Sequence, residues 1–117
     1  EGLKFNKFYL TLKNLSKSDQ VIEFYVDKNI LENSKYFEKD KKIILNQSFF
    51  NNPEEIILRS IMQVIKRISW KKNYPRGKKV NSLIDSIKFS NKNVKLTLSG
   101  CIIEKIQDSV IIYPEKR

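Results

Sequence analysis

Residues 94–113, VKLTLSGCIIEKIQDSVIIY, decide the fold class of this chain. Apolar and polar side chains alternate over residues 94–98, and this period of two predicts a strand with one covered face. Gly100 indicates a bend or bulge after that strand. Residues 101–106 and 110–113 have the composition of two further strands. We therefore predict a small antiparallel meander of three strands at this end of the chain.

The segment before the strands predicts two helices. Asn52 is a suitable helix cap, Pro53 suits the first turn, and two acidic residues follow where the helix dipole is positive. We expect this helix to run to about Ile68, and Pro75 then disfavours its continuation. Helical spacing resumes over residues 80–89, which predicts a second, shorter helix.

One face of the first helix should be buried, because its apolar residues recur at helical spacing. The predicted buried set is Ile57, Leu58, Ile61, Val64, Ile65 and Ile68. The predicted exposed set is Arg59, Gln63, Lys66 and Arg67.

The first fifty residues are predicted to be mainly helical. Apolar residues recur at helical spacing over residues 3–31, in one long helix or in two helices, the second capped by residues 16–19. Residues 33–40 are polar and predict a loop. Residues 42–45 predict a short strand or an extended arm.

These elements predict a single α+β domain spanning residues 1–117. Residues 1–50 form a helical lead-in with a short extended arm, and residues 51–117 form a helix-turn-helix pair followed by the β-meander. We expect the N-terminal helices and the helix-turn-helix pair to pack on one face of a small antiparallel three-stranded sheet, since such a sheet needs one covered face.

The composition excludes several classes of site. The chain has no histidine, so catalytic triads that depend on histidine cannot be built, and the single Cys101 allows neither an internal disulfide nor a cysteine zinc site. With only three glycines, it contains neither a Walker loop nor a dinucleotide-binding fingerprint. No apolar run approaches the ~20 residues that a membrane span needs. The only methionine is Met62, and we expect a cytoplasmic fragment of a longer chain.

The positive charge is concentrated in the second half of the sequence. The chain carries 23 lysines and arginines against 13 acidic residues, a net charge of +10. Residues 1–58 contain nine lysines and nine acidic residues, whereas residues 59–117 contain 14 basic and four acidic residues. The whole excess therefore comes from residues 59–117.

A basic block without acidic residues lies between the two predicted helices. Such a block attracts polyanions by counterion release, and interleaved aromatic rings can stack on unpaired bases. The candidate RNA-binding residues are Lys66, Arg67, Lys71, Lys72, Tyr74, Arg76, Lys78 and Lys79. The alternative is a solvated basic loop that binds nothing.

The order of elements from Asn52 to Glu115 resembles the region that follows the catalytic domain of tRNA(Ile)-lysidine synthetase. The most specific pieces are the turn Tyr74-Pro75-Arg76 and the stretch LTLSGCIIE at residues 96–104. Members of that family usually have a second glycine where Ser99 stands here. They often have an Arg-Glu pair where this chain has Pro114-Glu115.

The resemblance implies an ATP-dependent ligase that adenylates the wobble cytidine of a tRNA and joins it to free lysine. ATP and magnesium serve an N-terminal pyrophosphatase-type domain with an SGGxDS loop, and this sequence contains no such loop. The chain would be the tRNA-recognition part, not catalytic by itself, with no cofactor, catalytic residue or metal ligand of its own. Its partners would be tRNA and its own N-terminal catalytic domain, with no membrane involved.

Several alternatives stay open at this stage. Arg76 binds phosphate or ties the turn to a carboxylate such as Asp85 or Glu104, and Tyr74 stacks on a base or packs beneath the turn. Cys101 is expected to be a buried apolar residue. Two other functions are a free-standing nucleic-acid-binding domain and a protein-interaction or dimerisation module built on the apolar stripe of residues 5–30.

Overall fold

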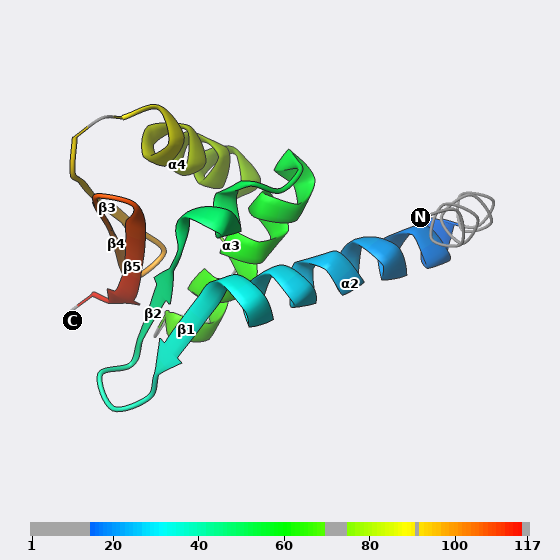
Figure 1. Ribbon diagram of the computed structural model, residues 1–117, viewed down its shortest axis with the longest axis horizontal. Helices are drawn as coiled ribbons and strands as arrows, with labels where there is room; N and C mark the ends of the chain where they lie inside the picture. Colours follow the sequence, from blue (N-terminus) through cyan, green and yellow to red (C-terminus); the bar gives the residue numbers. More distant parts are fainter. Residues whose placement is uncertain (1–14, 70–74, 91, 116–117) are drawn as a thin grey trace.

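The computed structural model describes residues 15–69, 75–90 and 92–115 (Figure 1). Its helical elements are α2 (Leu15–Asn33), the 3₁₀ helix η1 (Gln47–Phe50), α3 (Glu54–Ile68) and α4 (Gly77–Phe89). Its strands are β1 (Ser34–Phe37), β2 (Lys42–Leu45), β3 (Val94–Leu98), β4 (Cys101–Ile106) and β5 (Ser109–Pro114).

All five strands belong to one antiparallel sheet with the order β1-β2-β5-β4-β3. The prediction of a three-stranded sheet is therefore wrong, although the α+β class and the three C-terminal strands are observed. Residues 34–37 are a strand where a loop was predicted, and residues 42–45 pair with β5, with Ile43 opposite Ile112. This pairing buries Ile43 and Leu45, which explains why the short segment is a strand and not a free arm.

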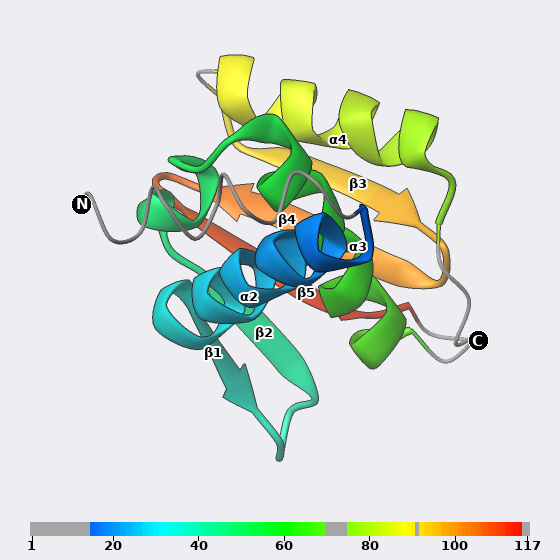
Figure 2. The ribbon, with the colours of Figure 1, turned by 90° about the vertical axis from the view of Figure 1, so that its right-hand side faces the viewer.

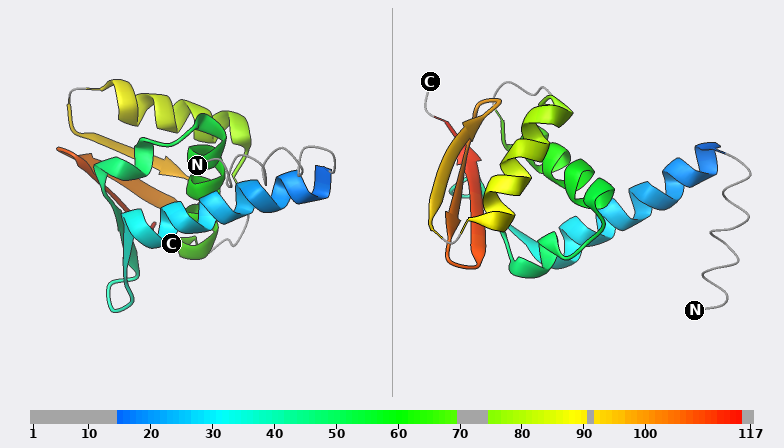
Figure 3. Two further views of the ribbon diagram at one scale, coloured as in Figure 1. Left: turned by 45° about the vertical axis from the view of Figure 1, so that its right-hand side comes forward. Right: turned by 90° about the horizontal axis from the view of Figure 1, so that it is seen from above.

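The helices α3 and α4 lie on one face of the sheet, as Figures 1 and 3 show. The core forms between these helices and the sheet residues that point toward them, including Ile43, Leu45, Ile103, Val110 and Ile112. Burial alternates along β4 and β5, as expected for a sheet with one covered face.

Helix α3 is the centre of the core and ends at Ile68, as predicted. The members of the predicted apolar face are buried, except for Leu58, which is half-buried and packs against the core. Lys66 and Arg67 are exposed, and Arg59 and Gln63 are half-exposed. The phasing of this helix is therefore confirmed.

Two predicted helix boundaries are wrong, and residues 16–19, which were considered as the cap of a second helix, lie inside α2. Gly77 is the first residue of α4, so this helix begins three residues before the predicted start. Pro53 and not Asn52 occupies the cap position of α3, and the Asn52 side chain makes no cap bond. Its amide is used elsewhere, because it donates to Asn29 Oδ1 at 3.0 Å and to the Phe49 carbonyl at 3.2 Å.

A buried amide, Asn29, ties α2 to the rest of the domain. Its Nδ2 donates to the Phe49 carbonyl at 3.3 Å and to Ser60 Oγ at 3.2 Å. Its Oδ1 accepts from Asn33 Nδ2 at 2.9 Å and from Asn52 Nδ2. One side chain with an exposed fraction of 3% thus connects α2, η1 and α3.

We expect Asn29→Ala to lower the free energy of unfolding by about 1–3 kcal/mol, because it leaves the buried Ser60 hydroxyl and the Phe49 carbonyl without this partner. Urea denaturation followed by circular dichroism measures the change. Lys28→Ala, at the neighbouring exposed position of α2, is the control and should change stability by less than about 0.5 kcal/mol. Equal effects of the two substitutions would show that the amide network does not hold α2.

Candidate nucleic-acid interface

The end of α3 carries two of the predicted RNA-binding residues, Lys66 and Arg67, both exposed. The position of this helix end is fixed by contacts with the turn between β3 and β4. The Ser69 hydroxyl donates to the Ser99 carbonyl, and the Cys101 Sγ lies 3.6 Å from the Ile65 carbonyl oxygen. The predicted burial of Cys101 is confirmed, since its exposed fraction is 0%.

The turn between β3 and β4, which contacts the end of α3, has an unusual backbone conformation. Ser99 has φ 51° and Gly100 has φ 82°, so both residues of the two-residue connection lie in the left-handed region. This is the conformation of the tight hairpin turns that suit the twist of paired strands. The bend predicted at Gly100 is confirmed, and it places the Ser99 carbonyl where Ser69 reaches it.

The beginning of α4 carries Arg76, Lys78 and Lys79, all exposed. Arg76 occupies the cap position with an extended backbone, and neither a side-chain cap nor an acidic residue is present in the first turn. Pro75 before it is buried. Figure 2 shows the beginning of α4 and the end of β3 on the same, right-hand side. We call this region, formed by Lys66, Arg67, Arg76, Lys78 and Lys79, the basic end.

The charges at the beginning of α4 are not compensated within the described residues. No ion pair joins Arg76, Lys78 or Lys79 to a carboxylate in this part of the chain, so the proposed tie from Arg76 to Asp85 or Glu104 is not formed there. Glu104 instead accepts a 2.5 Å hydrogen bond from the Tyr113 hydroxyl, and this bond raises the pKa of Tyr113 above its ordinary value.

Arg59, in contrast, is a cation whose charge is balanced by a neighbouring carboxylate. Its Nε donates to the Glu55 carboxylate at 2.7 Å, one turn earlier on α3. This hydrogen bond raises the pKa of Arg59 above its ordinary value. Arg59 therefore belongs to the helix surface and not to the basic end.

Three predicted site residues, Lys71, Lys72 and Tyr74, lie outside the described residues, as does Trp70. The other five lie at the ends of two successive helices, two at the end of α3 and three at the beginning of α4. The structure also adds a residue that the sequence reasoning missed, because the guanidinium carbon of Arg67 lies 4.3 Å from the centroid of the Tyr36 ring. The signal was present in the sequence as KYFEKDKK at residues 35–42, a cluster of basic and aromatic residues.

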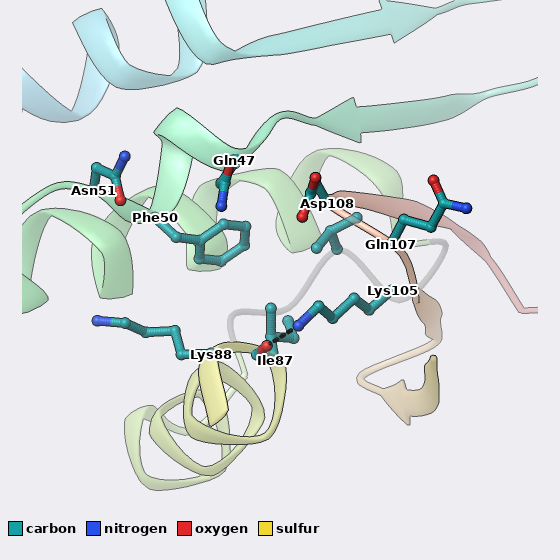
Figure 4. A pocket seen from close by; sticks show the side chains of 9 residues that line it. Gln47, Phe50, Asn51, Ile87, Lys88, Lys105, Gln107 and Asp108 are labelled. Carbon is teal, nitrogen blue, oxygen red and sulfur yellow. Dashed lines mark hydrogen bonds between the residues drawn. The ribbon is translucent and has the colours of Figure 1, made fainter. Parts of the chain in front are cut away.

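A separate cavity of about 190 Å³ opens between η1, the end of α4 and the turn between β4 and β5. Figure 4 shows Lys105 reaching toward the end of α4. Its ammonium donates to the carbonyls of Ile87 at 2.6 Å and Ser90 at 2.9 Å. Lys105 thus satisfies the negative end of α4, and the cavity is a packing feature of the fold.

Residues 15–69, 75–90 and 92–115 contain no group of three cysteine or carboxylate residues that could hold a metal ion. Among the helices of this part of the chain, none combines the length and the apolar character needed to cross a bilayer.

Comparison with family models, with curated proteins and with solved structures gives no match for this chain.

Proposed function

We propose that this chain is an RNA-binding module that recognises tRNA through the basic end. The observation that carries the proposal is the beginning of α4, where Arg76, Lys78 and Lys79 surround a helix terminus that lacks a side-chain cap and an acidic residue. The exposed Lys66 and Arg67 at the end of α3, the preceding helix, complete the proposed site.

The basic residues at the end of α3 stabilise the fold, whereas those at the beginning of α4 do not. Cations at the end of a helix are favourable, since they face the negative end of the dipole, so Lys66 and Arg67 have a structural explanation. Cations at the beginning of a helix are unfavourable by the same rule. Lys78 and Lys79 therefore make the isolated fold less stable, and a phosphate bound between them would remove this cost.

The resemblance to tRNA(Ile)-lysidine synthetase supplies the more specific part of the proposal. The module would help present the wobble cytidine to a catalytic domain that carries out the ATP-dependent joining of lysine. ATP and magnesium would act in that domain and not in this one. The module would work in the cytoplasm, where tRNA is modified.

We expect the 117-residue chain to bind tRNA with a strong dependence on salt. If about five of the seven basic residues between Lys66 and Lys79 neutralise phosphates, the slope of log K against log salt should be about −3.5 to −4.5. Fluorescence anisotropy with labelled tRNA, at potassium chloride concentrations from about 50 to about 300 mM, measures this slope. Absence of binding at low salt, or a slope near zero, would contradict the proposal.

A dimerisation module is the second candidate, and one observation favours it. Phe24 and Leu31 are seven residues apart on α2, with exposed fractions of 60% and 82%. Leu31 also lines a groove of about 290 Å³ between α2 and α3. Light scattering without RNA separates the two functions, because a dimerisation module requires a stable dimer in the absence of tRNA.

A further inference from the structure

The hairpin formed by β1 and β2 carries a net positive charge, although residues 1–58 as a whole have a net charge of zero. The helix α2 contains two lysines and four acidic residues, whereas residues 34–45 contain four lysines and two acidic residues. The neutral first half therefore consists of an acidic helix followed by a basic hairpin. Figure 2 shows the hairpin loop extending beyond the helices at the lower edge of the molecule.

One face of the hairpin holds two lysines that share one aromatic ring. The register places Phe37 opposite Lys42, and Lys35 lies two residues before Phe37 on the same face of the strand. The Nζ atoms of Lys35 and Lys42 lie 5.4 and 5.6 Å from the centroid of the Phe37 ring. The half-buried ring thus attracts each of the two cations through a cation–π interaction.

The hairpin tip adds two further cations. Lys39 and Lys41 are exposed, and the loop is closed by a hydrogen bond from the Lys41 amide to the Glu38 carbonyl at 3.2 Å. Asp40 lies 3.8 Å from the Lys42 ammonium, and an exposed pair at this distance contributes little. Protection of an exposed strand edge explains Lys35 on β1, but it does not explain Lys39, Lys41 or Lys42, which lie outside that strand.

The opposite face of the hairpin joins it to the basic end. Tyr36 is half-buried against the core, and the Arg67 guanidinium lies over its ring. Because Arg67 belongs to the last turn of α3, this contact makes the hairpin the neighbour of the basic end. The end of α3 thus lies beside the hairpin, and α4 is the next helix along the chain.

We propose that the β1–β2 hairpin is a second phosphate-binding element, which contacts the same RNA as the basic end. This inference rests on the proposed function and extends it to residues of the first half of the chain. Lys35 and Lys42 bind the phosphate backbone from one face of the hairpin, and Lys39 and Lys41 bind it from the tip. The contacts are sequence-independent, since each involves an ammonium group and a phosphate.

The test compares two double variants of the 117-residue chain, Lys35→Gln with Lys42→Gln and, as control, Lys88→Gln with Lys92→Gln. Both remove two positive charges, and the control residues are exposed at the far end of α4 and in the segment after it. The slope of log K against log salt for labelled tRNA should become less steep by about 1.4–1.8 in the hairpin variant and should hardly change in the control.

A second measurement does not depend on substitution. Acetylation of lysines followed by mass spectrometry, with and without tRNA, should show slower modification of Lys35, Lys39, Lys41 and Lys42 in the complex. Lys88 and Lys92 should react at the same rate in both samples.

The outcomes separate the two proposals. If the unmodified chain binds tRNA and neither double variant changes the slope, the hairpin inference is wrong and the proposed function stands. If the unmodified chain binds no tRNA, both are wrong. Equal loss of slope in the two variants would show that net charge alone attracts the RNA, and this too would overturn the inference.

Discussion

Replacing Lys78 and Lys79 by glutamate should weaken tRNA binding and stabilise the fold at the same time. The loss of two phosphate contacts should lower the affinity at least about tenfold near 0.1 M salt. The same change places two carboxylates at the positive end of α4, which should raise the free energy of unfolding by about 1 kcal/mol in total. Anisotropy and thermal denaturation of the same preparation measure the two effects.

The opposite signs make this experiment decisive. A variant that merely unfolds loses binding and stability together, so it cannot imitate the expected result. Lys88→Glu with Lys92→Glu reverses the same number of charges at the far end of α4 and should leave binding nearly unchanged. Equal loss of affinity from both double reversals would contradict a role for the beginning of α4.

The second large effect concerns the core, where Ile61→Ala should lower the free energy of unfolding by about 2–5 kcal/mol. Ile61 has an exposed fraction of 0% and lies in the middle of α3, at the centre of the main apolar cluster. Removal of its larger side chain leaves a cavity that rigid neighbours on α3, α4 and the sheet cannot fill.

Gln63→Ala, two residues further along the same helix and half-exposed, is the matched control. It should change stability by less than about 1 kcal/mol. Urea denaturation of the two variants gives both values. A similar cost for both residues would mean that α3 does not bury the face that contains Ile61.

The parts of the fold that were predicted correctly depend on patterns that are local in sequence. The apolar spacing of α3 and the alternation in β3–β5 each repeat several times within one element, so the period is clear. The cap of α3 was assigned wrongly for a long-range reason. Asn52 has the right residue type at the right place, but Asn29, on a different helix, engages its amide.

The first strand of the hairpin was missed, and its second strand was predicted only as one of two alternatives, because the local signals are weak. Each strand has four residues, which allows only two alternations of polar and apolar side chains. The turn contains no glycine or asparagine, yet Lys41 adopts φ 50°, a conformation that those residues usually supply. Pairing with β5 holds this strained turn in place, and no short stretch of sequence contains that information.

The basic block could be predicted because its residues are close together in the sequence. The role proposed for the hairpin lysines could not, because it depends on which segments the fold places side by side. The run from Lys66 to Lys79 is visible as a block without acidic residues, and its described members lie exposed at the end of α3 and the beginning of α4. The hairpin lysines were hidden because acidic residues of α2 balance them in a simple count. Only the fold separates the two groups in space.

The position of β5 has a consequence for how this chain acquires its structure. The last strand in sequence lies between β2 and β4, so it joins two parts of the sheet that do not otherwise pair with each other. During synthesis on the ribosome, the β1–β2 hairpin cannot join β4 and β3 in one sheet until β5 has emerged. Closing such a long loop is entropically costly and slows folding. The assembly of the complete five-stranded sheet therefore depends on the arrival of residues 109–114.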